Sequence, residues 1–231
     1  MVPYRFNQRM HQSFKTSHLP NLMPNQDLES LFLFNPDLVV THSLQFKPER
    51  VTRLREGGVR VLDLGSMRGF KTLREDILQF GQVVGEESRA IAYASRLERR
   101  LKTTAKHISK DSRKTAIWLA IYGDKLMGGT VGSGYHDVLT WSGMIDVMEG
   151  QAETPWPGIR TETVLKLNPQ VIVTDQGMEN RLKKIPGFDQ LQAVSENRII
   201  ELPKGSDTSG PAMVETCEWL CDKVYGPINF E

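Results

Sequence analysis

LESLFLFNPDLVVTH, at residues 28–42, and TETVLKLNPQVIVTD, at residues 161–175, are two copies of one sequence pattern. Each copy has a glutamate in second position, an apolar helical stretch, the dipeptide Asn-Pro and a run of β-branched residues. Because proline displaces the residue before it from the α region, we expect the helices to end near Asn35 and Asn168. The runs that follow suit buried parallel strands. Two copies 133 residues apart predict two similar α/β lobes.

Between the two copies, apolar residues recur at spacings of three and four from Glu86 to Ile108. This period predicts an amphipathic helix about 35 Å long. We therefore expect an α/β fold, with two lobes of mainly parallel sheet joined by a single long helix. The expected parts are an N-terminal lobe at 1–84, an inter-lobe helix at 85–109 and a C-terminal lobe at 110–231.

Further helix and strand signals alternate along the chain. A helix is expected at 48–56 and a strand at 59–64, with Gly57-Gly58 between them. TAIWLAI at 115–121 is a second strand signal, and the segment 122–134, with five glycines, indicates a loop or hairpin. Strands that alternate with helices favour parallel sheets.

The composition excludes several classes of protein. The 231 residues are 39% hydrophobic and 25% charged, and the net charge is +1. This balance argues against disorder and against a strongly basic nucleic-acid binder. Arginine and lysine gather on one face of the 86–108 helix, but no aromatic residues are interleaved with them, so we interpret that face as solvated. Since no run of 18 apolar residues occurs, no membrane span is expected.

Catalytic and metal-binding signatures are scarce. Gly132-Ser133-Gly134 lacks the spacing of a nucleophile elbow, and the glycine-rich stretch has no Gly-Lys-Ser/Thr. The five histidines show no zinc-site spacing. Cys217 and Cys221 are four residues apart, and on one helix face that spacing does not favour disulfide geometry. We therefore predict no catalytic residue, no metal site and no cofactor, and we expect a binding protein rather than an enzyme.

Taken in order, these segments resemble the class III periplasmic substrate-binding proteins, which serve ABC importers of ferric siderophores, haem and cobalamin. NPDLVVTH at 35–42 and NPQVIVTD at 168–175 are similar to the family's PDLVI strands, and GGVRVLDL at 57–64 to its GIPV strand. TPWPGIRTETVL at 154–165 resembles a stretch of the cobalamin-binding members, and AVSENRIIELP at 193–203 the closing strand. The resemblance covers about residues 20–225.

The resemblance also predicts a difference at the N-terminus. Family members carry a further strand and helix before the segment that Val2-Pro3-Tyr4 resembles, together with an export signal. The first residues here, MVPYRFNQRMHQSF, have no apolar h-region. We therefore expect a chain that is truncated by one βα unit, with a first lobe whose stability is reduced. The family itself implies a periplasmic or extracytoplasmic location.

For the two glutamates, the resemblance implies a docking role. In this family, one glutamate on each lobe pairs with arginines of the membrane permease, and Glu29 and Glu162 occupy matching repeat positions. The simpler interpretation is that a glutamate in a first helical turn favours the helix dipole. With the family in view we expect docking, so that the partner is an ABC permease and the membrane is reached only through it.

The ligand is expected between the lobes, near the carboxyl ends of strands. Arg5 and Arg68 suit an anionic chelate, and His42 and Tyr135 are residue types that ligate haem iron. Trp156 matches a ligand-stacking tryptophan of the cobalamin binders or else packs on its own lobe. Further positions that follow strands are Met67, Asp175 and Lys204.

The sequence is compatible with several ligands. Met23 and His42 stand where cobalamin binders carry two more tryptophans, which weakens cobalamin as the ligand. We expect an iron chelate, either a siderophore or haem, or a similar metal complex, with cobalamin and an oxyanion such as molybdate as alternatives. A different class, a cytosolic α/β enzyme or a metal-cluster protein with similar lobes, is favoured only by the missing export signal.

Overall fold

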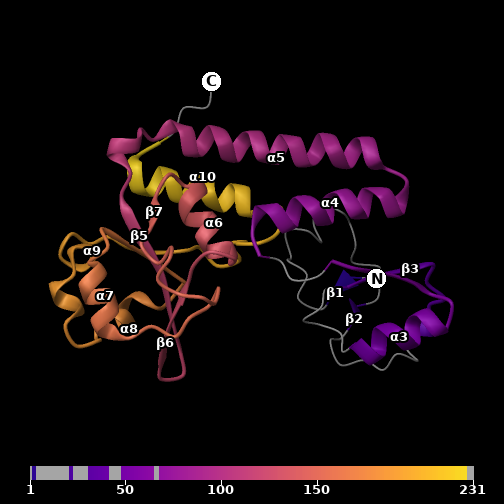
Figure 1. The fold of residues 1–231 in the computed structure, drawn as a ribbon, viewed down its shortest axis with the longest axis horizontal. Helices are drawn as coiled ribbons and strands as arrows, with labels where there is room; N and C mark the ends of the chain where they lie inside the picture. The colour runs from indigo at the N-terminus through magenta and orange to yellow at the C-terminus, as the bar shows by residue number, and fades with distance from the viewer. Residues whose placement is uncertain (1, 4–20, 23–30, 42–47, 65–67, 228–231) are drawn as a thin grey trace. The chain divides into compact units, whose positions relative to one another are not determined.

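A computed structural model describes residues 2–3, 21–22, 31–41, 48–64 and 68–227. The chain divides into two compact units, Met1–Ser66 (unit 1) and Met67–Glu231 (unit 2) (Figure 1). This boundary differs from the predicted lobe limit at residue 84, because the helix that ends there belongs to unit 2. The predicted lobes at 1–84 and 110–231, and the linking role of 85–109, stay predictions.

Unit 1 contains a βαβ element. The strands β3 (Leu38–Thr41) and β4 (Arg60–Asp63) pair in parallel, and the helix α3 (Pro48–Glu56) lies between them in the chain. Pro48 opens α3 at the position where a missing N–H costs nothing, and Gly57-Gly58 follows its end. The two short strands β1 (Val2–Pro3) and β2 (Asn21–Leu22) also pair in parallel. The small core consists of Leu31, Leu54 and Val59, with Val39 and Val61 packed on it.

Unit 2 is built on a five-stranded sheet. Its strands are β5 (Thr115–Tyr122), β6 (Lys125–Gly129), β7 (Ile145–Asp146), β8 (Val171–Thr174) and β9 (Ile199–Glu201). The order is β6-β5-β8-β9, and β7 pairs with the first residues of β5. Only β6 runs antiparallel, since it forms a hairpin with β5 through Gly123-Asp124. The predicted α/β fold with mainly parallel sheets is confirmed.

Helices cover both faces of this sheet (Figure 1). One face packs against α4 (Phe70–Val84), α5 (Glu87–His107), α6 (Gly134–Trp141) and α10 (Met213–Tyr225). The other face packs against α7 (Thr161–Leu167), α8 (Glu179–Leu182), η3 (Phe188–Gln190) and α9 (Gln192–Ser195). A short turn, η2 (Lys110–Ser112), leads from α5 into β5. The alternation along β5 separates the faces: Trp118 and Ala120 enter the first core, and Ile117 and Leu119 the second.

The long helix expected at 86–108 is confirmed as α5. It forms a hairpin with α4, and the two helices are so close that a Cβ on Gly81 would lie 2.3 Å from the Cβ of Ala90. α4 ends at Gly85, whose φ of 74° is left-handed and suits glycine. Arg100 on α5 forms two hydrogen bonds with Glu218 on α10, at 2.8 and 2.6 Å. These contacts hold α5 within unit 2.

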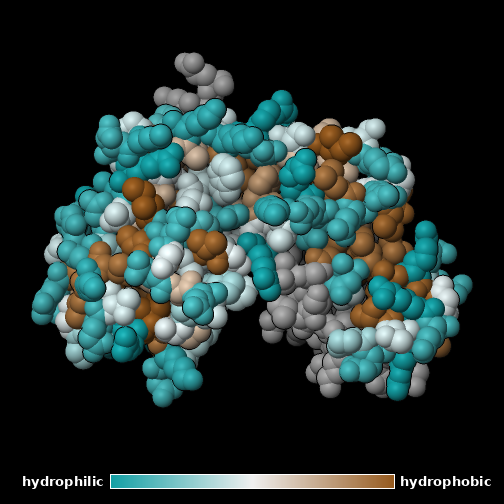
Figure 2. Space-filling view, in the orientation of Figure 1, coloured by the Kyte–Doolittle hydropathy of each residue, from teal (hydrophilic) through white to brown (hydrophobic). Residues whose placement is uncertain are grey.

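The surface of α5 matches the expected solvated face. Arg96, Arg99, Lys102 and Lys106 are all exposed, and Figure 2 shows hydrophilic surface along the C-terminal half of this helix. Nearer the α4–α5 turn, Phe80, Val84 and Ile91 are exposed instead. In the part of the chain that the structure describes, no helix is long and apolar enough to cross a membrane.

Candidate functional site

The carboxyl ends of the parallel strands in unit 2 bring polar side chains together at one edge of the sheet. Tyr122 is the last residue of β5, and Asp175 directly follows β8, its neighbour in the sheet. The alternation puts Tyr122 on the face of Trp118 and Ala120, and Asp175 on the face of Val173. The two polar side chains therefore continue one apolar face of the sheet beyond its core.

Tyr135, a predicted ligand residue, joins this edge from α6. Its ring stacks on Trp118, with ring centroids 3.6 Å apart and an angle of 14° between the rings. Glycines make the close packing possible: a Cβ on Gly129 would lie 2.9 Å from the Cβ of Tyr135, and one on Gly134 would lie 1.9 Å from the carbonyl oxygen of Thr208. The stack places the Tyr135 ring against Trp118 on this face of the sheet.

The hydroxyl groups of the two tyrosines and the carboxylate interact with one another. The Tyr122 hydroxyl donates a hydrogen bond to Oδ2 of Asp175 at 3.5 Å, and Tyr135 is close enough for both groups to influence its pKa. We call Tyr122, Tyr135 and Asp175 the carboxyl-edge cluster. Tyr122 is 56% exposed and Tyr135 is half-buried, so the cluster has one open side.

Burial sets the protonation of the cluster. It raises the pKa of Tyr135 strongly, and the adjacent Asp175 carboxylate and Tyr122 raise it further. Burial also raises the pKa of Asp175, although the hydrogen bond from Tyr122 acts in the opposite direction. The pKa of Tyr122 is raised as well, first by burial and then by Asp175. Both tyrosines therefore carry hydroxyl protons at neutral pH, and the cluster offers O–H donors beside oxygen acceptors.

A second polar group anchors the start of α6, next to Tyr135. Nδ1 of His136 lies 2.8 Å from Oδ2 of Asp146, which also accepts a hydrogen bond from the Thr130 hydroxyl at 3.2 Å. The other carboxylate oxygen of Asp146 accepts from the Met148 N–H at 2.9 Å. The hydrogen bond to Asp146 raises the pKa of His136, while burial lowers it. Because both carboxylate oxygens of Asp146 are engaged within the protein, we interpret this group as structural.

Hydrogen bonds of the residues next to Arg68 place its segment beside α6, the helix that carries Tyr135. The backbone N–H of Arg68 bonds to the Thr72 hydroxyl at 2.9 Å, and Arg68 itself is exposed. Two residues later, the N–H of Phe70 donates to Oδ2 of Asp137 at 2.5 Å. Asp137 follows Tyr135 by two residues in α6, so this bond ties the segment carrying Arg68 to the helix carrying Tyr135.

Trp156 lies on the edge of the β5–β6 hairpin and is 43% exposed. The flanking carbonyl groups fix its loop: Pro155 accepts from the Thr130 N–H at 3.0 Å and Pro157 from the Gly128 N–H at 2.9 Å. This pairing puts Trp156 opposite Gly129, which itself pairs with Trp118. Along β5, that register is about 13 Å from Tyr122, at about 3.3 Å per residue.

Three predicted site residues lie outside the described residues: Arg5, His42 and Glu29. The same holds for Met23 and Met67. Glu162 is described, and it is exposed in the first turn of α7. Lys204 is exposed just after β9. The structure therefore brings Tyr135, Asp175 and the Arg68 segment into one region of unit 2 and leaves the other assignments as predictions.

Tyr122 is the residue that the sequence analysis missed. The glycines after it favoured a loop from residue 122 onward, whereas β5 extends through Tyr122 and pairs it with Lys125. A signal was available, because Tyr122 continues the alternate positions of Trp118 and Ala120. In the described residues there is no group of three or more His, Cys, Asp or Glu side chains that could hold a metal ion.

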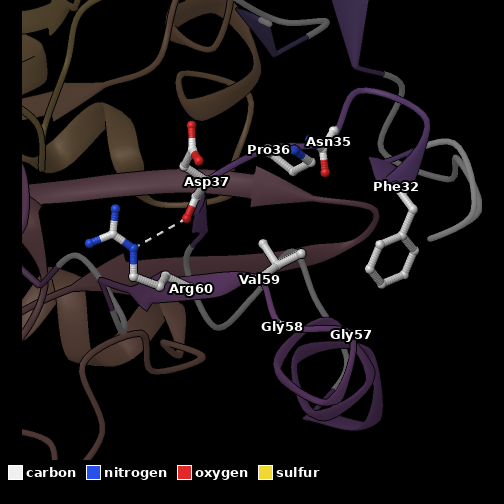
Figure 3. A pocket seen from close by; sticks show the side chains of 8 residues that line it. All are labelled: Phe32, Asn35, Pro36, Asp37, Gly57, Gly58, Val59 and Arg60. Atoms are coloured by element: carbon white, nitrogen blue, oxygen red, sulfur yellow. Dashed lines mark hydrogen bonds between the residues drawn. The ribbon is translucent and has the colours of Figure 1, made fainter.

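Two surface pockets are lined by residues outside this cluster. Figure 3 shows the first, a pocket of about 370 Å³ in unit 1, where Arg60 Nε donates to the Asp37 carbonyl oxygen at 3.3 Å. Asp37 precedes β3 and Arg60 opens β4, so this pocket lies at the amino ends of the strands, while ligands of α/β folds bind at carboxyl ends. The second, about 500 Å³, lies against β9 and α10. Neither contains a predicted site residue.

Comparison with known proteins identifies the family of the chain. The family model described as periplasmic binding protein matches residues 11–205. The uncharacterized ABC transporter substrate-binding lipoprotein YvrC of Bacillus subtilis (strain 168) is 26% identical over 209 residues. That alignment covers 87% of this chain and 66% of the relative, so the chain spans just under two thirds of the relative's length.

Solved structures share the fold. The periplasmic haem-binding protein HutB of Vibrio cholerae is 14% identical, with a TM-score of 0.79 over 91% of this chain and 86% of that one. The periplasmic vitamin B12-binding protein BtuF of the same species is 17% identical, with a TM-score of 0.69 over 93% and 85%. At these identities the similarity establishes the fold and leaves the ligand open.

Proposed function

Because the chain belongs to the periplasmic binding protein family, we propose that it is the substrate-binding component of an ABC importer. In this role it captures a ligand on the extracytoplasmic side and delivers it to a permease, and it carries out no chemical reaction. The membrane is contacted only through the permease, and nucleic acid is not a partner. Glu29 and Glu162 are the proposed docking residues.

We propose further that the ligand is an iron chelate. The observation that carries this proposal is the carboxyl-edge cluster, which presents two phenol groups and a carboxylate at the edge where α/β folds bind ligands. Oxygen donors of this kind suit hard metal ions and the polar rim of their chelates. The nearby segment of Arg68, together with Arg5, supplies positive charge for an anionic chelate. His42 and Trp156 complete the proposed set of contacts.

Cobalamin is the second candidate. It is favoured by Trp156, which is 43% exposed in a loop whose backbone is fixed by hydrogen bonds to the carbonyl groups on both sides of the residue. An aromatic face fixed in this way is suited to stacking against a flat macrocycle. The carboxyl-edge cluster, with its hydroxyl donors and carboxylate, adds no particular preference for a corrin ring.

A titration of the full chain tests the proposal. Tryptophan fluorescence is followed while a ferric trihydroxamate, ferric citrate, haemin, cyanocobalamin or molybdate is added. We expect saturable quenching by at least one of the three iron complexes. Saturation by cyanocobalamin or molybdate alone would assign the other ligand class, and a chain that binds none of the five would contradict a role in the import of such ligands.

A further inference from the structure

A buried hydrogen-bond network joins the Trp156 loop to the start of α6, the helix that carries Tyr135. Its centre is Thr130, which follows β6 and is 1% exposed. The N–H of Thr130 donates to the Pro155 carbonyl oxygen at 3.0 Å, directly before Trp156. The Thr130 carbonyl oxygen accepts from the N–H and the hydroxyl of Ser133, at 2.9 and 2.7 Å. One residue therefore bonds to two parts of the candidate site.

Asp146 holds the Thr130 side chain in place. The Thr130 hydroxyl donates to Oδ2 of Asp146 at 3.2 Å, and the same oxygen lies 2.8 Å from Nδ1 of His136. Since a carboxylate oxygen is an acceptor, Nδ1 is the protonated nitrogen of this pair. The Asp146 side chain is completely buried, so breaking either bond would leave a buried acceptor without its donor. The network therefore favours one closed arrangement.

The network fixes the chain on both sides of Tyr135. Ser133 is completely buried and caps α6, because its hydroxyl accepts the His136 N–H at 3.4 Å. Ser133 bonds to Thr130, and His136 bonds to Asp146. Since Ser133 and His136 lie on either side of Tyr135 in the chain, the network sets the position of the helical turn that carries the Tyr135 ring.

The same network fixes the backbone of the Trp156 loop. The bond from Thr130 reaches the residue directly before Trp156. The loop also packs on the turn that leads into α6, since a Cβ on Gly132 would lie 3.2 Å from Cγ of Pro155. A displacement of this turn would therefore move the Trp156 loop as well.

We propose that Thr130 and Asp146 are positioning residues of the binding site, which hold Tyr135 and the Trp156 loop as one rigid body before a ligand arrives. This inference rests on the proposed function, in which Tyr135 and Trp156 contact the ligand. A site that is already ordered loses less conformational entropy on binding, so it binds more tightly. Because Thr130 and Asp146 are themselves buried, they act on affinity through the two residues that they position.

Substitutions of Thr130 in the full chain test the network. Thr130→Val keeps the β-branched shape and removes the hydroxyl, whereas Thr130→Ser keeps the hydroxyl. Thr140→Val, on α6, is the matched control, because the Thr140 hydroxyl bonds to the carbonyl groups of His136 and Asp137 in its own helix. Circular dichroism and urea denaturation identify the conditions in which the compared variants are folded.

The first readout is the Trp156 side chain in the ligand-free protein. Replacement of the four tryptophans by 5-fluorotryptophan gives four fluorine resonances, and Trp156→Phe assigns the resonance of Trp156. In Thr130→Val we expect this resonance to move toward its position in the urea-unfolded protein, because the loop gains mobility. It should stay at the wild-type position in Thr130→Ser and Thr140→Val. The resonance of Trp219, on α10, should be unchanged in all three variants. An unchanged Trp156 resonance in Thr130→Val would overturn the inference.

The second readout is affinity, measured by calorimetric titration with the same ferric trihydroxamate, ferric citrate, haemin, cyanocobalamin and molybdate. We expect Thr130→Val to weaken binding of the probe that the wild type binds by about tenfold, and Thr130→Ser to recover most of that loss. A purely structural role would lower the free energy of unfolding and leave the affinity of the folded protein unchanged.

The affinity measurement separates this inference from the proposed function. If one of the five probes binds Thr130→Val as tightly as the wild type, the inference fails and the proposed function stands. If none of the five binds the wild type, the proposed function fails, and the inference fails with it.

Amide hydrogen exchange of the unmodified protein tests the network without any variant. The N–H of Thr130 bonds to the Trp156 loop, and the N–H of Ser133 belongs to the start of α6. If the two parts form one rigid body, these two N–H groups should exchange with the same opening free energy and the same dependence on urea. The N–H of Asp124, at the exposed hairpin tip, should exchange much faster. If Thr130 exchanges as fast as Asp124 while Ser133 stays protected, the loop opens on its own and the inference is wrong, even where Thr130→Val does not fold.

Discussion

Asn35 and Asn168 have the same left-handed backbone conformation, with φ of 43° and 40°, at matching positions of the two repeat copies. Each is followed by proline, and a parallel strand begins three residues after each asparagine, at Leu38 and Val171. Asparagine tolerates this conformation better than other residues with a side chain, which explains its presence in both copies. The repeat in the sequence is thus a repeat of backbone geometry, in which one residue turns the chain from helix to strand.

The residue type at Asn168 should have a measurable effect on the free energy of unfolding. Asn168→Ala places at this φ a residue that tolerates the left-handed region less well than asparagine, and it also removes the acceptor of the Gln192 N–H, at 2.9 Å. We expect it to lower the free energy of unfolding by about 1–2 kcal/mol in urea denaturation. Asn168→Gly, which relieves the backbone strain but not the lost hydrogen bond, should recover part of that loss. Equal losses in the two variants would show that the backbone conformation is not the cause.

The elements of the fold were largely predictable because their signals are local. The helix 48–56 matches its prediction because Pro48 and Gly57-Gly58 mark its two ends. The candidate site was harder to predict from the sequence. The stack of Tyr135 on Trp118 joins residues whose contact depends on the packing of α6 against the sheet. Asp175 could be predicted as a site residue because it follows a strand. The glycines after Tyr122 instead favoured a loop, so the sequence did not predict that β5 extends to Tyr122.

The close approach at Gly134 gives a second stability prediction. A Cβ at this residue would lie 1.9 Å from the Thr208 carbonyl oxygen, which belongs to the backbone and cannot move aside alone. Gly134→Ala should therefore lower the free energy of unfolding by about 1–3 kcal/mol, as overpacking does elsewhere. Gly158→Ala is the matched control, because its nearest neighbour would be 4.0 Å away. If both variants unfold at the same urea concentration, the packing of α6 differs from that described.

The pair of His136 and Asp146 should make stability depend on pH. Because the hydrogen bond to Asp146 raises the pKa of His136 in the folded state, with Asp137 and Glu149 acting in the same direction, protonated His136 stabilises the fold. This contribution is fully present below the unfolded value of about 6.5 and is lost as the pH rises through the folded pKa. The difference in unfolding free energy between the wild type and His136→Asn should therefore be larger near pH 5.5 than near pH 8.5. A difference that is constant with pH would contradict the protonated pair.

Trp156 gives a prediction about ligand affinity. If its exposed ring stacks on the bound ligand, Trp156→Ala should weaken binding by about 1–3 kcal/mol, measured by calorimetric titration with the ligand that the fluorescence panel identifies. Trp156→Phe should retain part of the affinity because it keeps an aromatic face. Ile145→Ala, at a residue 45% exposed, is the control and should have no effect. Unchanged affinity in Trp156→Ala would show that the ring packs on its own unit instead.

Glu162 is exposed at the start of α7, as docking onto a permease requires, and Glu29 is its counterpart in the first repeat copy. Charges at the rim of an interface mainly affect association and orientation. Glu29→Ala and Glu162→Ala should therefore leave ligand affinity intact. Each should reduce ligand uptake in cells or proteoliposomes that contain the cognate importer. Uptake with the double variant should be lower than with either single variant. Glu153→Ala, which removes another exposed carboxylate of unit 2, is the control for net charge. Full uptake by the double variant, with normal ligand binding, would contradict docking and would leave Glu162 only the role of favouring the dipole of α7.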